Sequence, residues 1–89
     1  MNNVKRKELS KISERLSEAR DILSYIKSDL EYVLSEEEDI LDNMERFSGT
    51  ERYSAIEEAV DNMNEAVDSL EEAIDEIDNA VESIDDAQK

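Results

Sequence analysis

Residues 56–84 read IEEAVDNMNEAVDSLEEAIDEIDNAVESI, and an apolar residue returns in this stretch at every third or fourth position. Such spacing is the seam of a heptad repeat, in which one stripe of an α-helix packs against a partner helix. The seam residues are Ile56, Val60, Met63, Val67, Leu70, Ile74, Ile77, Val81 and Ile84. The pattern contains no helix breaker and predicts an α-helix over residues 51–87.

The first half of the chain carries the same repeat. Its seam residues are Leu9, Ile12, Leu16, Ala19, Leu23, Ile26, Leu30, Val33, Ile40, Met44 and Phe47. Only Glu37 interrupts them, and two explanations stay open: its aliphatic part packs while its carboxylate reaches water, or the helix turns locally onto Leu34 and Leu41. The pattern predicts an α-helix over residues 4–46.

The connection, residues 47–50, contains the only glycine of the chain. Gly49 can adopt a left-handed conformation beyond a helix end, and Thr50 can cap the helix that follows. A capping box formed by Ser48 and Glu51 is an alternative for the same boundary. Because a short connection joins two long helices, we expect an antiparallel hairpin.

Charge at the helix ends supports the same topology. The first helix opens with basic residues and the second closes with acidic ones, which are Lys5, Arg6, Lys7, Lys11, Asp85 and Asp86. Each set is unfavourable for the dipole of its own helix. An antiparallel hairpin places the two sets side by side, so we expect ion pairs between the helices at this end.

We therefore predict an all-α fold with one domain over residues 1–89, an antiparallel two-helix hairpin of the coiled-coil type. A chain this short has little interior of its own. Ile22, Leu34 and Leu41 lie beside the predicted seam and make the apolar surface of the first helix wider than one partner helix needs. Both points favour a homodimer that forms a four-helix bundle.

Alanines recur every seven residues beside the seam of the second helix, at Ala59, Ala66, Ala73, Ala80 and Ala87. Small side chains allow another helix to approach closely. Alanine is also the strongest helix former, so helix propensity alone is the alternative explanation.

Composition excludes most kinds of catalytic and metal site. The chain has no Cys, His, Trp or Pro. Disulfides, thiolate metal sites, histidine acid–base catalysis and Ser-His triads are therefore excluded, and no glycine-rich phosphate loop or EF-hand loop is present. We expect no enzyme activity, no cofactor and no metal site, with only loose counterions around Glu36–Asp39.

No apolar run approaches the length of a transmembrane helix, and charged residues follow the first Met, Asn and Asn instead of a signal-peptide core. We expect a cytoplasmic protein that does not bind membranes.

The acidic balance is the strongest functional signal, with a net charge of −16. Eight acidic residues and no basic residue lie between Asp29 and Glu45. Across the hairpin they would face the five acids between Glu57 and Asp68. These 13 charges occupy about 27 Å of helix, or one per about 2 Å, close to the one per about 1.7 Å of duplex DNA.

Direct binding to nucleic acid is excluded, because phosphate contacts need a basic footprint that the chain lacks. The charge instead suits a mimic of nucleic acid that blocks the basic groove of a nucleic-acid-binding protein. The partner-binding candidates are Glu36, Glu38, Asp39, Asp42, Glu57, Glu58, Asp61, Glu65 and Asp68. An equally weighted alternative is that the acidity keeps a small helical protein soluble.

A second candidate interface consists of Ile22, Tyr25 and Tyr32, which lie away from the hairpin seam. Outward tyrosines on one stripe are typical of a binding hot spot. Packing inside a homodimer is the simpler explanation. If these residues bind a partner, the protein is a structural or adaptor coiled coil.

The segments Asp42–Met44, Thr50–Tyr53 and Glu57–Met63 resemble a group of small acidic helical-hairpin proteins from Firmicutes and their phages. Those proteins carry Ser-Glu-Arg at the turn, followed by heptads with Glu, Ala and a hydrophobic residue. The resemblance implies a mobile-element setting, in which small acidic proteins block host nucleases or defence complexes, as anti-CRISPR inhibitors do. It carries no activity over to individual residues.

Overall fold

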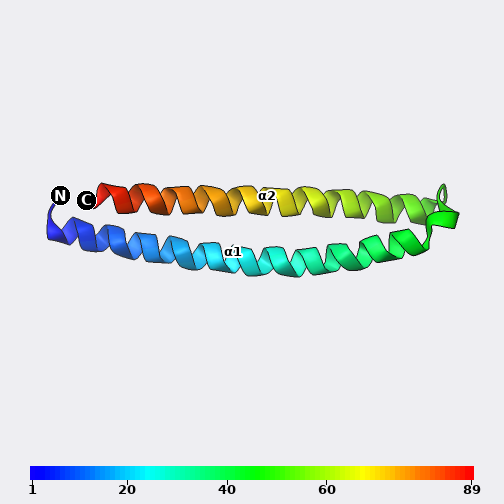
Figure 1. Ribbon diagram of the computed structural model, residues 1–89, viewed down its shortest axis with the longest axis horizontal. Helices are drawn as coiled ribbons and strands as arrows, with labels where there is room; N and C mark the ends of the chain where they lie inside the picture. Colours follow the sequence, from blue (N-terminus) through cyan, green and yellow to red (C-terminus); the bar gives the residue numbers. More distant parts are fainter.

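The computed structural model describes residues 1–89 and is an antiparallel hairpin of two long α-helices (Figure 1). Helix α1 spans Asn3–Asn43, a short 3₁₀ helix η1 spans Glu45–Phe47, and α2 spans Glu51–Ala87. Both termini lie at one end of the rod and the turn lies at the other. The molecule measures 66 × 15 × 14 Å. Its radius of gyration of 19.8 Å far exceeds the value of about 12 Å for a compact chain of this length, so most residues remain near solvent.

The turn contains two of the predicted features, a left-handed Gly49 and a helix cap formed by Thr50. Gly49 has a φ of +97°, a left-handed conformation that side chains disfavour. Thr50 caps α2, because its Oγ1 accepts a hydrogen bond from the Tyr53 amide at 3.2 Å. The Thr50 cap is thus the one formed. Helix α1 ends at Asn43, earlier than expected, because the chain tightens into η1 to reverse direction, and the Phe47 amide bonds to the Met44 carbonyl at 2.7 Å.

The predicted seam of α2 is confirmed. Val60, Val67 and Ile74 are buried, and the other six seam residues are half-buried. Helix α2 therefore turns all of its large aliphatic side chains toward α1.

The predicted seam of α1 is wrong on one of its two rows. Its buried and half-buried residues are Leu9, Ser13, Leu16, Arg20, Leu23, Ser24, Lys27, Leu30, Leu34, Glu37, Leu41 and Met44. Apart from Ser24, these alternate by four and three residues, whereas the prediction alternated by three and four. The row that begins with Leu9 is common to both patterns, and we call it the leucine row.

The second predicted row is exposed to solvent. It consists of Ile12, Ala19, Ile26, Val33, Ile40 and Phe47, which we call the outer stripe. The leucine row has a flank on each side, and one partner helix can cover only one of them. Helix α2 covers the flank that carries Leu34 and Leu41. Relative to the prediction, α1 is therefore rotated along its whole length and not only near Glu37. Glu37 itself stays in the leucine row and is half-buried.

The flank of α1 that α2 covers is apolar near the turn and polar near the termini. Leu34, Val60 and Val67 form the buried cluster. Leu30, Leu41, Ile56 and Met63 pack against it. Toward the termini the same flank of α1 carries Ser13, Arg20 and Lys27, whose contacts with α2 are polar.

The neighbours Leu34 and Val33 test this orientation, because their exposed fractions are 7% and 46%. We expect Leu34→Ala to lower the free energy of unfolding by about 2–5 kcal/mol, since it leaves a cavity in the core cluster. Val33→Ala should lower it by about 0.5 kcal/mol or less in the isolated hairpin. Urea unfolding followed by circular dichroism in dilute solution measures both, and the reverse order would place the seam on the outer stripe.

Candidate protein-binding surfaces

Polar contacts at heptad spacing join one flank of α1 to one flank of α2. The Ser13 hydroxyl donates to the Asp85 carboxylate at 3.0 Å, and Arg20 Nε donates to Asp78 Oδ1 at 3.1 Å. Lys27 Nζ lies 3.0 Å from Glu71 Oε1. The partners are spaced by seven on both helices, and their residue numbers sum to 98 in every pair. We call this row of contacts the ladder, and it defines the register of the hairpin.

The ladder corrects the predicted pairing of the helix ends. Arg20 and Lys27 make the ion pairs between the helices, and the four basic residues nearest the N-terminus make none. At the other end, Asp85 accepts a hydrogen bond from Ser13, and Asp86 pairs with Lys89 on its own side of the hairpin. The basic side chains that lie on the covered flank are the ones that reach α2.

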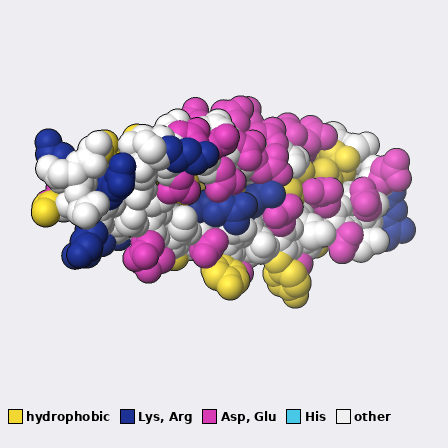
Figure 2. Space-filling model, turned by 60° about the vertical axis from the view of Figure 1, so that its left-hand side comes forward, with side chains coloured by type: hydrophobic (Ala, Val, Ile, Leu, Met, Phe, Trp, Pro, Cys, Tyr) yellow, Lys and Arg dark blue, Asp and Glu magenta, His cyan; other side chains and the backbone are white.

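The half of the hairpin near the turn has no charge compensation of this kind. None of the ion pairs involves a residue between Tyr32 and Leu70. Arg46 and Arg52 are the only basic residues in that range, and the Arg46 guanidinium lies 4.9 Å above the Phe47 ring. Figure 2 shows acidic side chains crowded along one edge of the molecule, with basic side chains toward both ends and near the middle.

All nine acidic residues predicted to bind a partner are exposed. Helical position divides them among four surfaces. Glu38, Asp42, Glu57, Asp61 and Asp68 continue the side of the hairpin that carries the ladder, and we call this set the acidic flank. The others follow separately: Glu58 and Glu65 lie on the back of α2, Asp39 lies on the back of α1, and Glu36 lies beside the outer stripe.

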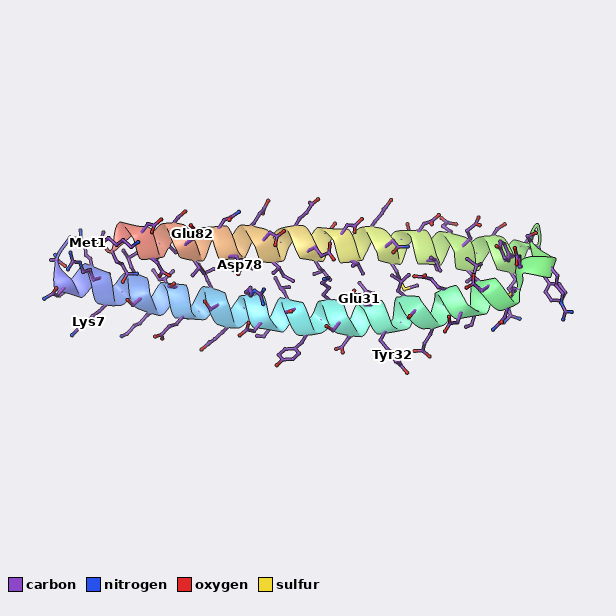
Figure 3. All side chains as sticks on the ribbon, viewed as in Figure 1. Met1, Lys7, Glu31, Tyr32, Asp78 and Glu82 are labelled. Carbon is purple, nitrogen blue, oxygen red and sulfur yellow. The ribbon has the colours of Figure 1, made fainter.

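A second surface is apolar and belongs to the first 47 residues alone. All ten exposed large hydrophobic side chains lie there: Met1, Val4, Ile12, Ile22, Tyr25, Ile26, Tyr32, Val33, Ile40 and Phe47. The predicted alternative interface is among them, with exposed fractions of 58% for Ile22, 74% for Tyr25 and 69% for Tyr32. Figure 3 shows Tyr32 pointing away from α2. The outer stripe was not predicted from the sequence, because its residues were assigned to the seam of the first helix.

The side chains give little support for a small-molecule pocket, a metal site or a membrane-spanning segment. An open hollow of about 490 Å³ at the turn is lined by Ile40, Asn43, Met44, Phe47, Thr50 and Arg52. No group of three or more acidic side chains is arranged to hold a metal ion. Neither helix combines the length and apolar character of a membrane span.

Comparisons with protein-family profiles, with curated proteins and with solved structures gave no match.

The uncompensated charge predicts that salt stabilises the fold. Repulsion among exposed acids is screened at about 0.1 M salt, where the Debye length is about 10 Å, while the exposed ion pairs lose about 1 kcal/mol or less each. We expect Tm to rise between low salt and about 0.1 M NaCl. A variant with Asp61→Asn, Glu65→Gln and Asp68→Asn should show a smaller rise. A Tm that falls with salt would mean that the ion pairs outweigh the repulsion.

Lys27 makes the stability of the hairpin depend on pH in the alkaline range. The hydrogen bond to the Glu71 carboxylate raises the pKa of Lys27 above its ordinary value of 10.5, and the charge of Glu31 acts in the same direction against partial desolvation. Because folding favours the charged amine, its contribution is present below pH 10.5 and is lost as pH rises through the higher pKa of the folded state.

We therefore expect the wild type to lose Tm relative to Lys27→Met when the pH is raised above 10.5. Lys5→Met removes a lysine without any ion pair and serves as the matched control, for which the difference in Tm should stay constant. A constant difference for Lys27→Met as well would show that its contact with Glu71 contributes nothing to stability.

Proposed function

We propose that this protein is a cytoplasmic, non-enzymatic inhibitor that mimics nucleic acid and blocks the basic groove of a nucleic-acid-binding protein. The observation that carries the proposal is the acidic flank, which is exposed and uncompensated on the side of a rigid rod. In its active form the hairpin is a homodimer arranged as a four-helix bundle.

Charge spacing supports mimicry. Five acidic residues lie between Glu57 and Asp68 on α2. They cover about 17 Å at about 1.5 Å per residue, or one charge per about 3.3 Å, close to the spacing of phosphates along one DNA strand. Helical backbone hydrogen bonds fix the Cα positions from which these carboxylates project, so a basic groove can bind them without ordering a flexible backbone.

The resemblance to acidic hairpin proteins of Firmicutes and their phages suggests where such an inhibitor acts. In a mobile element, a protein that blocks a host nuclease or defence complex, as an anti-CRISPR inhibitor does, protects the element's nucleic acid. Such host proteins bind phosphate backbones through lysine and arginine grooves, which are complementary in sign to the acidic flank.

A structural or adaptor coiled coil is the second candidate function, and the exposure of Ile22, Tyr25 and Tyr32 favours it. In that case a helix of the partner packs on α1 and the acids only keep the protein soluble. The two functions differ in salt dependence. Mimicry weakens steeply with ionic strength, whereas apolar helix packing does not.

Two matched triple variants test the mimicry. The first is Asp61→Asn, Glu65→Gln and Asp68→Asn, near the turn. The second is Glu72→Gln, Asp75→Asn and Glu82→Gln, at equivalent helical positions nearer the termini and outside the ion pairs. We expect the wild-type protein, immobilised in a host lysate, to retain a protein that added duplex DNA releases and moderate salt elutes.

The first triple variant should lose most of that retention, and the second should keep most of it. Circular dichroism should show both variants folded, since the seam is unchanged. Retention that survives the first triple, resists duplex DNA and disappears with Tyr25→Ala and Tyr32→Ala would replace mimicry with the adaptor function.

A further inference from the structure

The outer stripe of α1 has no partner within the hairpin, although its residues recur every seven positions from Ile12 to Phe47. The part of this run on α1, from Ile12 to Ile40, is about 42 Å long at about 1.5 Å per residue. A regular heptad stripe of this length is typical of helix-to-helix packing, and scattered single exposed residues would not show it. Helix α2 has no comparable exposed stripe, so the unfilled contact is specific to α1.

The five stripe residues on α1, from Ile12 to Ile40, are spaced symmetrically about Ile26, and Phe47 lies beyond them in η1. In an antiparallel pair of α1 helices with Ile26 opposite the partner's Ile26, Ile12 lies opposite the partner's Ile40. Ala19 then lies opposite the partner's Val33. The five layers from Ile12 to Ile40 join apolar side chains, and the smallest side chain meets a β-branched one of medium size, while Phe47 is level with the partner's Lys5 outside them. A second copy of the chain therefore fits the stripe by spacing alone.

Charge complementarity gives the direction of pairing. The first 27 residues hold seven bases and four acids, while the eight charged residues from Asp29 to Glu45 are all acidic. An antiparallel pair places the basic half of each α1 beside the acidic half of the other. A parallel pair would place acid beside acid and base beside base along the whole contact, which is destabilising.

The residues that flank the stripe agree with this arrangement one by one. At the same register, the partner's Glu36 lies within one residue of the level of Arg15, and the partner's Asp39 lies within two residues of the level of Lys11. The partner's Asp29 lies within one residue of the level of Ile22, and the two Tyr25 residues lie within two residues of each other's level near the symmetry axis. None of these flank positions joins two like charges.

The alanines of α2 lie on the same side of the hairpin as the outer stripe. The ladder occupies the other side, and its register puts Ala73, Ala66 and Ala59 within one residue of the levels of Ile26, Val33 and Ile40, respectively. Ala73 and Ala80 are half-buried, while Ala59 and Ala66 are exposed. Small side chains there leave room for a second hairpin to approach face to face.

We propose that two copies of this chain associate through the outer stripes of their α1 helices, antiparallel, with Ile26 on the two-fold axis. This inference rests on the homodimer of the proposed function and adds its interface and direction. The interface buries the stripe and pairs Glu36 and Asp39 with basic residues of the partner. The acidic flank of each hairpin stays outside, so the dimer carries two copies of it.

Cysteine cross-linking tests the interface directly, because the native chain has no Cys. We compare Ile26→Cys alone, Ile12→Cys alone, Ile40→Cys alone, and an equal mixture of the last two. Ser28→Cys, exposed on the other side of α1, is the control. Residues held together in a complex have an effective concentration of about millimolar, so cross-linking should be on the order of a thousandfold faster than for the control at about micromolar concentration.

We expect fast cross-linking of Ile26→Cys with itself and of the mixture, and slow cross-linking of Ile12→Cys or Ile40→Cys alone. Fast cross-linking of Ile12→Cys alone and of Ile40→Cys alone, with slow cross-linking of their mixture, would establish parallel pairing and overturn the proposal. Sedimentation at the same concentration separates the other failures. A dimer without fast cross-linking at any stripe position uses another face, so the homodimer stands and the proposed interface falls. A monomer overturns both, while the DNA-release experiment still reports on mimicry.

Discussion

One geometric constraint organises this molecule: α2 can cover only one of the two flanks of the leucine row on α1. The covered flank is apolar near the turn, where Leu34 joins Val60 and Val67, and polar near the termini, where the ladder lies. The other flank, the outer stripe, remains in solvent. Both surfaces of functional interest follow from this choice, because it decides which apolar residues are exposed and which basic residues are used within the hairpin.

The constraint also separates the roles of the two helices. Helix α2 directs its seam inward and its acids outward, so it contributes most of the negative surface. Helix α1 supplies Arg20 and Lys27 to α2 at one end, and its own uncovered flank is apolar. A dimer formed through α1 would bury the apolar surface and leave the acidic one accessible. Binding of a basic partner and self-association then use different faces and do not compete.

Much of the fold could be predicted from the sequence, because α2 has only one apolar stripe and the turn contains Gly49 and Thr50. The orientation of α1 could not, since hydrophobicity favours Ile26 and Val33 over Lys27 as seam residues. The sequence signal for this orientation was that Arg20 and Lys27 are seven residues apart, as are their partners Asp78 and Glu71. The exposure of the acidic candidates was predictable from their charge, but the placement of those on α1 among the surfaces required the rotation of α1.

Methyl NOE spectroscopy on the labelled protein tests the orientation of α1 most directly, because it detects which methyl groups are within contact distance. The structure predicts cross-peaks from the Leu34 methyls to those of Val60 and Val67, and none from the Val33 methyls to either residue. Cross-peaks from Val33 to Val60 or Val67, with none from Leu34, would contradict the account, since α2 would then cover the outer stripe and leave the other flank exposed.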